Sequence, residues 1–245
     1  MKVSIVTVVY NGEDGILKTM ESVRAQTHED IEYLLIDGAS KDGTLRKIEE
    51  YKDTLTGKGI QVRIVSEPDG GIYDAMNKGI RLATGDIIGI LNCGDFYEPN
   101  AAAVAAQTFA EKECELMFAN LRIHKEDGSN FVKKARLRKY QTSRDWNHPT
   151  TFVRSDLYKE YPFRKLGIHD DYGFYLQMCK QNRKIVVVDQ VLANFVMGGV
   201  SNKKSLKAAR KRIKDRYKYC YRINGYSRFY YFECLMMEAA KWILG

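Results

Sequence analysis

The segment VSIVTVVYNG, residues 3–12, decides the fold class of this 245-residue chain. Its first seven residues, mostly Val, Ile and Thr, are typical of a strand buried on both faces of a parallel sheet. A similar run at Ile31–Ile36 follows a segment with apolar residues at helical spacing. The alternation continues through strand patterns at Gln61–Val65 and Ile87–Leu91, each preceded by a helical pattern. This order predicts an α/β fold in which helices flank a mainly parallel, Rossmann-like central sheet.

The second half of the chain has a less regular pattern. Leu116–Ile123 and Asn130–Ala135 flank Glu126-Asp127-Gly128, which predicts a β-hairpin. Two helices and one strand are predicted after it, at Arg154–Glu160, Asp171–Asn182 and Ile185–Val188. We expect one domain over residues 1–200 and a separable, helical C-terminal extension over 201–245.

Composition and charge limit the classes of protein that fit. The formal net charge is +8, but residues 203–228 carry eleven Lys or Arg against one acid, Asp215, so the remainder sums to −2. The basic character is therefore assigned to the tail, and residues 1–200 are not interpreted as a nucleic-acid binder. Five scattered cysteines without a C-x-x-C pair favour neither a disulfide framework nor a zinc site, in keeping with a cytoplasmic protein. No apolar run is long enough to cross a bilayer, and no secretory signal is recognised.

Polar residues cluster directly after each of the four predicted parallel strands, where ligands bind in open α/β sheets. The clusters are Tyr10-Asn11-Gly12, Asp37-Gly38-Ala39-Ser40, Glu67-Pro68-Asp69-Gly70-Gly71 and Asn92-Cys93-Gly94-Asp95. Four clusters on one edge predict a binding site, although ordinary turns favour the same residue types. No G-x-G-x-x-G follows the first strand and no G-x-x-x-x-G-K-[ST] occurs, so neither a dinucleotide cofactor nor a P-loop nucleotide is indicated.

Asp95 suits a hard divalent cation. Mg²⁺ and Mn²⁺ need only one or two protein carboxylates when substrate phosphates complete the coordination shell. Asp95 follows a buried strand, and Gly94 before it lets a ligand approach the backbone closely. We therefore predict that a cation at Asp95 neutralises a bound diphosphate.

Several ordered motifs resemble the family 2 glycosyltransferases of the GT-A fold. They are SIVTVVYN (residues 4–11), DGASKDGT (37–44) and ATGD (83–86) leading into LNCGD (91–95). The segment EPDGGIYDAMNKG (67–79) is similar to a subgroup that builds bacterial surface polysaccharides, including colanic-acid-type transferases. The resemblance covers about residues 1–200. It implies a metal-dependent, inverting hexosyltransferase with a nucleotide-sugar donor half over about 1–98 and an acceptor half over about 99–200.

The resemblance also implies roles for single residues. It implies that Tyr10 lies against the nucleobase and that Asp37 accepts from the base or ribose. It further implies that Asp69 lies near the base and Lys78 near the phosphates. The remaining residues of the implied nucleotide-sugar site are Asn11, Ser40, Asn92, Gly94 and the metal ligand Asp95.

Two positions depart from the common pattern of the family. Gly38 stands where many relatives have a second Asp that reads uracil, so UDP- and GDP-sugars both stay open as donors. Asn92-Cys93-Gly94 replaces the earlier acid of the metal motif D-x-D. Metal binding is therefore expected to depend on Asp95 and the donor diphosphate.

A second concentration of acids, Asp170-Asp171, opens a predicted helix. Transfer of a sugar to a hydroxyl needs a base near the nucleophile, and a carboxylate beside a like charge has a raised pKa that suits this task. The pair resembles the E-D element of the family, which makes Asp171 the catalytic base and Asp170 its neighbour. The implied reaction is a single displacement with inversion. The alternative is that the acids only stabilise the positive end of the helix.

Two further positions are weaker candidates for the acceptor or phosphate side. His148 precedes the helix at Arg154–Glu160, and a lone histidine is as often structural as functional. Gly199 belongs to GGVS (198–201), which reads either as a loop closing over the donor or as a plain turn.

The tail combines a basic segment with closely spaced tyrosines and a short apolar stretch. Lys and Arg would be attracted to anionic head groups, so we expect peripheral attachment to the inner face of the cytoplasmic membrane, next to a saccharide or polyprenyl-linked acceptor. The alternatives are a solvated helix packed on the domain or on a second subunit of a homo-oligomer, and a nucleic-acid binder without a recognised module.

Two other functions compete with sugar transfer. A sugar nucleotidyltransferase also uses an α/β nucleotide fold and a metal, but residues 11–14 after the first strand are acidic rather than basic and Gly-rich. A non-catalytic nucleotide-sugar binder would explain the edge and leave Asp170 and Asp171 without a role.

Overall fold

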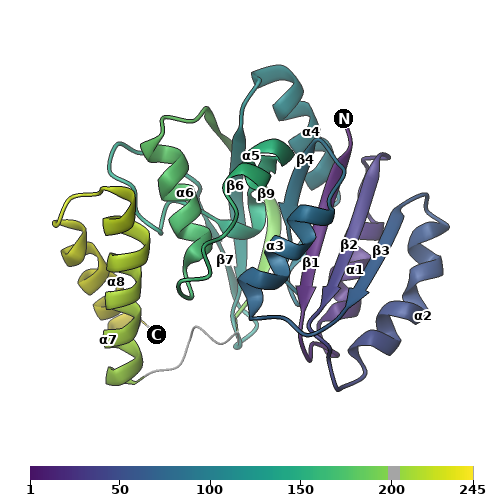
Figure 1. The fold of residues 1–245 in the computed structure, drawn as a ribbon, viewed down its shortest axis with the longest axis horizontal. Helices are drawn as coiled ribbons and strands as arrows, with labels where there is room; N and C mark the ends of the chain where they lie inside the picture. Colours follow the sequence, from purple (N-terminus) through teal and green to yellow (C-terminus); the bar gives the residue numbers. More distant parts are fainter. Residues whose placement is uncertain (198–204, 245) are drawn as a thin grey trace.

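A computed structural model describes residues 1–197 and 205–244 as a nine-stranded sheet with helices on both faces (Figure 1). The strands are β1 (Val3–Val9), β2 (Ile31–Asp37), β3 (Gln61–Ser66), β4 (Ile87–Ile90), β5 (Phe96–Tyr97), β6 (Leu116–His124), β7 (Asn130–Lys133), β8 (Phe152–Arg154) and β9 (Ile185–Val196). The helices of the domain are α1 (Ile16–Arg24), α2 (Thr44–Thr56), α3 (Ile72–Leu82), α4 (Ala101–Lys112), the short η1 (His148–Thr150), α5 (Ser155–Glu160) and α6 (Asp170–Lys180). The tail contains α7 (Leu206–Asp215), η3 (Arg216–Tyr221), η4 (Arg222–Asn224) and α8 (Tyr230–Leu244).

The order of strands in the sheet is β3-β2-β1-β4-β8-β6-β9-β5, and β7 pairs with β6 as the predicted hairpin. The first four strands are parallel, as expected from the alternating first half. The second half is mixed, because β8 runs antiparallel to both β4 and β6, whereas β6 and β9 are parallel. The predicted α/β class and flanking helices are confirmed, and the parallel character belongs mainly to the first half.

The register of β4 against β8 matters for the site. Ile87 faces Arg154 and Gly89 faces Phe152, so the residues before β8 lie beside the carboxyl end of β4. The segment that contains His148 therefore reaches the same edge of the sheet as Asp95.

Two apolar layers cover the sheet. Strands β1 and β2 are buried along their whole length, so their alternating side chains enter both layers. Helices α1, α2 and α4 pack on one face, with Ile16, Met20 and Phe109 in the core. Helices α3, α5 and α6 pack on the other, together with tyrosines from the tail.

The tail is expected to be separable, but in the structure it packs closely on α6 (Figure 1). The Tyr221 and Tyr172 hydroxyl groups are 2.9 Å apart, and Asn224 donates to the carbonyl of Gly173 at 2.9 Å. Within the tail, the buried Arg212 and Glu238 join α7 to α8 at 2.7 Å. Tyr221 is therefore buried against the domain, a role that the clustering of the tail tyrosines alone does not distinguish from surface binding.

Candidate active site

The parallel strands β1 to β4 place the four predicted polar clusters at one edge of the sheet. The first two clusters are joined directly. The amide of Asn11 donates to Ser40 Oγ at 2.8 Å, and the amide of Lys41 donates back to Asn11 Oδ1 at 2.9 Å. Asn11 and Ala39 both have positive φ, which brings the two turns into this arrangement. Asn11 and Ser40 thus hold the loops after β1 and β2 together.

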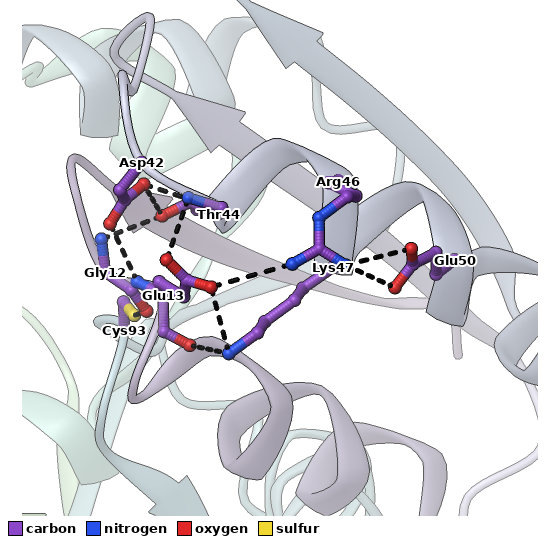
Figure 2. Close-up of polar contacts among 9 residues, drawn as sticks. Gly12, Glu13, Asp42, Thr44, Arg46, Lys47, Glu50 and Cys93 are labelled. Atoms are coloured by element: carbon purple, nitrogen blue, oxygen red, sulfur yellow. Dashed lines mark hydrogen bonds and ion pairs between the residues drawn. The ribbon is translucent and has the colours of Figure 1, made fainter.

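A second set of contacts, around Glu13, ties the same two loops together (Figure 2). The amide of Gly43 donates to Glu13 Oε2 at 2.9 Å, and this bond is the main reason that the pKa of Glu13 is lowered. Lys47 Nζ lies 3.4 Å from Glu13 Oε1, and the amide of Glu13 donates to Asp42 Oδ2 at 3.1 Å. Glu13 therefore has a structural role, because it joins the loop after β1 to the loop after β2.

Asp37 is fully buried at the end of β2. Its carboxylate accepts from the Ser40 amide at 3.1 Å, from the Ser40 hydroxyl, and from Ser66 Oγ at 2.6 Å. Tyr10, in contrast, is 61% exposed. The structure thus places the Asp37 carboxylate beneath the edge, where it holds two loops, and leaves the ring of Tyr10 open to a ligand.

Asp69 occupies the space that a side chain at position 38 would need. A Cβ built on Gly38 would lie 2.6 Å from Asp69 Oδ2 and 3.4 Å from Tyr10 Cδ2. The carboxylate of Asp69 therefore lies beside Gly38 and Tyr10, close to the place where the missing second acid would be. Lys78, on α3, has its amine 2.8 Å from Glu67 Oε1 and is only 11% exposed.

Asp95 lies at the end of the turn after β4 and is 5% exposed. Burial raises the pKa of its carboxyl group to about 7, and the amide of Val196 at the end of β9 donates to Oδ1 at 3.2 Å. Gly94 has φ +95°, a backbone conformation that favours glycine. The turn is fixed to α1, since Thr19 Oγ1 donates to the carbonyl of Asp95 at 2.8 Å.

The residues of this turn fit a hard cation. Asn92 Oδ1 is buried without a hydrogen-bond partner, and the amide of Asp95 donates to the carbonyl of Asn92 at 3.1 Å. An amide oxygen and a buried carboxylate are the ligand types that Mg²⁺ and Mn²⁺ prefer. Within the part of the chain that the structure describes, no three His, Cys, Asp or Glu side chains form a metal cluster. Any cation here would therefore need further oxygen ligands from a substrate.

Asp171 is held between two side chains from other elements. Tyr73, in the first turn of α3, donates its hydroxyl to Asp171 Oδ1 at 2.8 Å. His148 Nδ1 lies 3.7 Å from Asp171 Oδ2, and burial lowers the pKa of His148, which favours the neutral ring. The Asp171 carboxylate remains 21% exposed and lies in the first turn of α6. It is thus oriented and open to a proton donor.

Asp170 points elsewhere. Its Oδ2 accepts from the amide of Leu166 at 2.7 Å, and burial is the main cause of its raised pKa. Asp170 is only 6% exposed. In the structure this acid fixes the loop before α6, whereas Asp171 faces Tyr73 and His148. Gly199 lies outside the described residues.

The sequence motifs contained Tyr73 without assigning it a role, and they left His148 unconnected to Asp171. Tyr73 lies in the segment 67–79 that carried the family resemblance, but hydroxyl contacts across 98 positions have no signature in residue spacing. His148 and Asp171 meet because β8 is antiparallel to β4, a pairing that the three-residue strand did not reveal.

Replacing Tyr73 by Phe removes the hydroxyl that orients Asp171. We expect kcat for any sugar transfer to fall about tenfold, since hydrogen bonds to charged groups contribute 1.5–3 kcal/mol, while KM for the donor stays unchanged. Tyr161→Phe is the matched control, since the Tyr161 hydroxyl accepts from Arg183 at 3.2 Å. Equal losses in both variants would argue against an orienting role.

Comparisons with known proteins agree on the family. A family model described as Glycosyl transferase family 2 matches residues 4–175. An uncharacterised glycosyltransferase of Mycobacterium tuberculosis is 38% identical over 112 residues, which are 45% of this chain and 40% of that protein. Chondroitin synthase of Pasteurella multocida is 34% identical over 128 residues, 52% of this chain and 13% of that protein. The matched segments therefore span less than half the length of either relative.

Solved structures give the same fold. S. aureus TarS superposes with a TM-score of 0.64 at 19% identity, over 98% of this chain and 71% of that one. The mannosyltransferase PcManGT of Pyrobaculum calidifontis, solved with GDP-Man and Mn²⁺, gives a TM-score of 0.63 at 16% identity, over 100% of this chain and 64% of that one. The architecture is therefore that of the GT-A glycosyltransferases. By its family match, the chain belongs to glycosyl transferase family 2.

Proposed function

We propose that this protein is an inverting, divalent-metal-dependent glycosyltransferase that moves a sugar from a UDP- or GDP-sugar to an acceptor hydroxyl in the synthesis of a bacterial surface polysaccharide. The observation that carries the proposal is the position of Asp171, oriented by Tyr73 and His148 at the edge that also holds Asp95. Sugar transfer needs a base for the acceptor and a site for the departing diphosphate, and this edge offers a candidate for each.

Asp171 is the proposed base. It would take the proton of the acceptor hydroxyl while that oxygen attacks the anomeric carbon from the face opposite the nucleotide, which inverts the configuration. Tyr73 donates to one carboxylate oxygen, so the other oxygen, near His148, is the one left to accept the proton. A base held within hydrogen-bond reach contributes about 10²–10⁴-fold to such reactions.

Asp95 and Asn92 are the proposed protein ligands of the cation. When bound, the cation would offset negative charge on the diphosphate leaving group. The buried Asn92 oxygen and the raised pKa of Asp95 support this assignment, because a nearby positive charge would satisfy both groups. The Mn²⁺ of the PcManGT complex supports it by analogy.

Tyr10 and Asp69 are the proposed contacts to the nucleobase. The exposed ring of Tyr10 offers a stacking surface, and the Asp69 carboxylate beside Gly38 could accept from a base N–H. Proteins of similar fold bind different nucleotide sugars, since TarS was solved with UDP-GlcNAc and PcManGT with GDP-Man. Both nucleotides therefore enter the first test.

The test is a panel of UDP-, GDP- and dTDP-sugars, assayed with Mn²⁺ for release of the free nucleoside diphosphate. We expect one nucleotide to be preferred and release to stop when EDTA removes the metal. A sugar nucleotidyltransferase would instead consume the nucleotide sugar with pyrophosphate and release a nucleoside triphosphate. Release of triphosphate, or binding without any turnover, would contradict the proposal.

The tail supports a second part of the proposal, peripheral attachment to an anionic membrane surface. No helix in the described ranges is both long and apolar enough to cross a bilayer. However, Phe229, just before α8, and Phe232 and Met236 within it are 80%, 61% and 69% exposed. Arg210 and Lys214 of the neighbouring α7 are also exposed, and each cation near an anionic surface contributes about 1 kcal/mol.

Flotation with vesicles tests this attachment. We expect the protein to float with phosphatidylglycerol vesicles and to stay at the bottom with phosphatidylcholine vesicles. The triple replacement of Phe229, Phe232 and Met236 by Ser should abolish flotation, because it removes the apolar side chains that would enter the interface. Phe131→Ser, at a ring that is 47% exposed on β7, is the control. Flotation that persists in the triple variant would leave the tail without this role.

A further inference from the structure

A basic cavity of about 660 Å³ lies beside β7, away from the nucleotide loops. It is formed by β7 and the irregular segment that follows, down to Asp145. Six cationic side chains line it: Lys133, Lys134, Arg136, Arg138, Lys139 and Arg144. The only acid among its lining residues is Asp145. The cavity therefore combines concave shape with a strong excess of positive charge.

Most of this charge is not neutralised by the protein. Arg138 pairs with Asp145 at 3.3 Å, and Lys134 pairs with Asp189 at 2.7 Å. Arg136 and Lys139 are exposed and form no ion pair within residues 1–197 and 205–244. Like charges gathered in a concavity repel one another, so an anionic ligand would be favoured there.

Lys133 lines this cavity, and its amine is held in place. Its amine donates to the carbonyl of Ser143 at 3.0 Å and to that of Trp146 at 2.8 Å. Burial lowers the pKa of Lys133 to about 8. A bound anion would favour the charged amine.

The wall of the cavity continues directly to the proposed base. Asp145 is followed by Trp146, whose ring stacks on Tyr175 at 5.3 Å and lies 5.7 Å from the ring of His148. His148 in turn lies 3.7 Å from Asp171. The cavity and the base thus lie on either side of one short segment, residues 143–148.

That segment is rich in buried polar atoms without partners. Each of them requires a water molecule or a ligand group in the folded protein. They are Ser143 Oγ, Trp146 Nε1, Asn147 Oδ1 and His148 Nε2. These four residues do not line the cavity themselves; their unsatisfied atoms lie in the segment between the cavity and Asp171.

We propose that the cavity binds an anionic group of the acceptor, a phosphate, diphosphate or carboxylate, and thereby directs the acceptor hydroxyl toward Asp171. This inference rests on the proposed glycosyl transfer and adds the chemical class of the acceptor. Two sources share this chemistry: the diphosphate of a lipid-linked acceptor and the carboxylates of an acidic saccharide. A solvated basic surface with no ligand is the competing explanation.

The experiment measures binding of three probes by calorimetry in EDTA, which prevents metal-bridged binding at the donor side. The probes are inorganic pyrophosphate, trigalacturonate and uncharged maltotriose. The test variant is Arg136→Glu with Lys139→Glu, because both side chains are exposed and unpaired in the described chain. The control is Lys58→Glu with Lys112→Glu, two exposed lysines after α2 and at the end of α4 that make the same change in net charge.

We expect at least one anionic probe to bind the unsubstituted protein and to bind the test variant about tenfold or more weakly, with little change in the control. Loss for pyrophosphate alone points to a diphosphate-linked acceptor, and loss for trigalacturonate alone points to an acidic saccharide. Equal affinities in test and control variants, or binding of neither anion, would overturn the proposal.

Donor hydrolysis in the absence of acceptor separates this inference from the proposed function. It requires the nucleotide-sugar site and not the cavity, so the test variant should keep the full rate. If no nucleotide sugar is hydrolysed by the unsubstituted protein while anion binding still depends on Arg136 and Lys139, the proposed function fails and the anion site stands. If hydrolysis is intact and anion binding does not depend on them, the cavity proposal fails alone.

Discussion

Replacing Asp171 by Asn is expected to lower kcat for sugar transfer by about 10²–10⁴-fold while leaving affinity for the nucleotide unchanged. The amide has the same shape and can still accept from the Tyr73 hydroxyl, but it cannot take a proton from the acceptor. The measurement is steady-state transfer, together with calorimetric titration of the nucleoside diphosphate.

The control for this prediction is Asp156→Asn. Asp156 lies in the first turn of α5, as Asp171 lies in the first turn of α6, and it pairs with Arg154 at 2.6 Å on the surface. If transfer were lost equally in both variants, or retained in Asp171→Asn with an unchanged melting temperature, Asp171 would not be the base. A non-catalytic binder of nucleotide sugars would then be the better description.

Replacing Asp95 by Asn should reduce metal-dependent turnover by about 10²–10³-fold, since a stabiliser of the departing charge is weakened. The same replacement should not lower the stability of the metal-free protein. Burial raises the pKa of Asp95 to about 7, so the folded protein without metal is penalised for ionising this group as the pH rises. A neutral amide avoids that penalty and can keep the bond from Val196.

Thermal melting with and without Mn²⁺ checks this second prediction. The unsubstituted protein should gain stability from Mn²⁺ with the nucleotide, and Asp95→Asn should gain none while melting no lower than the parent in EDTA. Asp86→Asn, at the opposite end of β4, is the control, because the Asp86 side chain accepts from the amide of Lys2 at 2.8 Å, far from the proposed cation. Mn²⁺ stabilisation that survives in Asp95→Asn would place the cation elsewhere.

The first half of the fold followed from its hydrophobic pattern, because fully buried parallel strands consist of continuous apolar runs. The second half was harder for identifiable reasons. Helix α4 is not among the predicted elements, since Ala101–Lys112 offers mainly small residues and little contrast between its faces. Strand β9 was predicted to stop at Val188 but runs to Val196, because a register irregularity next to β6 accommodates the polar residues 189–190.

The sequence predicts which polar clusters gather at one edge of the sheet, but not the contacts that their side chains make. Strand order places the clusters at one edge, which general topology could foresee. The hydrogen bonds of Asp37 inside the protein, and the meeting of His148 with Asp171, depend on side-chain directions and an antiparallel strand that sequence spacing does not encode. The basic segment after β7 was missed because the near-neutral charge of residues 1–200 conceals six cations within twelve positions.

The contact of the tail with α6 has a consequence for how such proteins can be recombined. Cys220 lies with its thiol 3.2 Å from the carbonyl of His169, and Asn224 binds the carbonyl of Gly173. These bonds bracket the first turn of the helix that presents Asp171. A chimera that exchanges C-terminal segments between relatives would have to carry α6 with them. Helix α6 and the C-terminal tail would therefore have to be exchanged together.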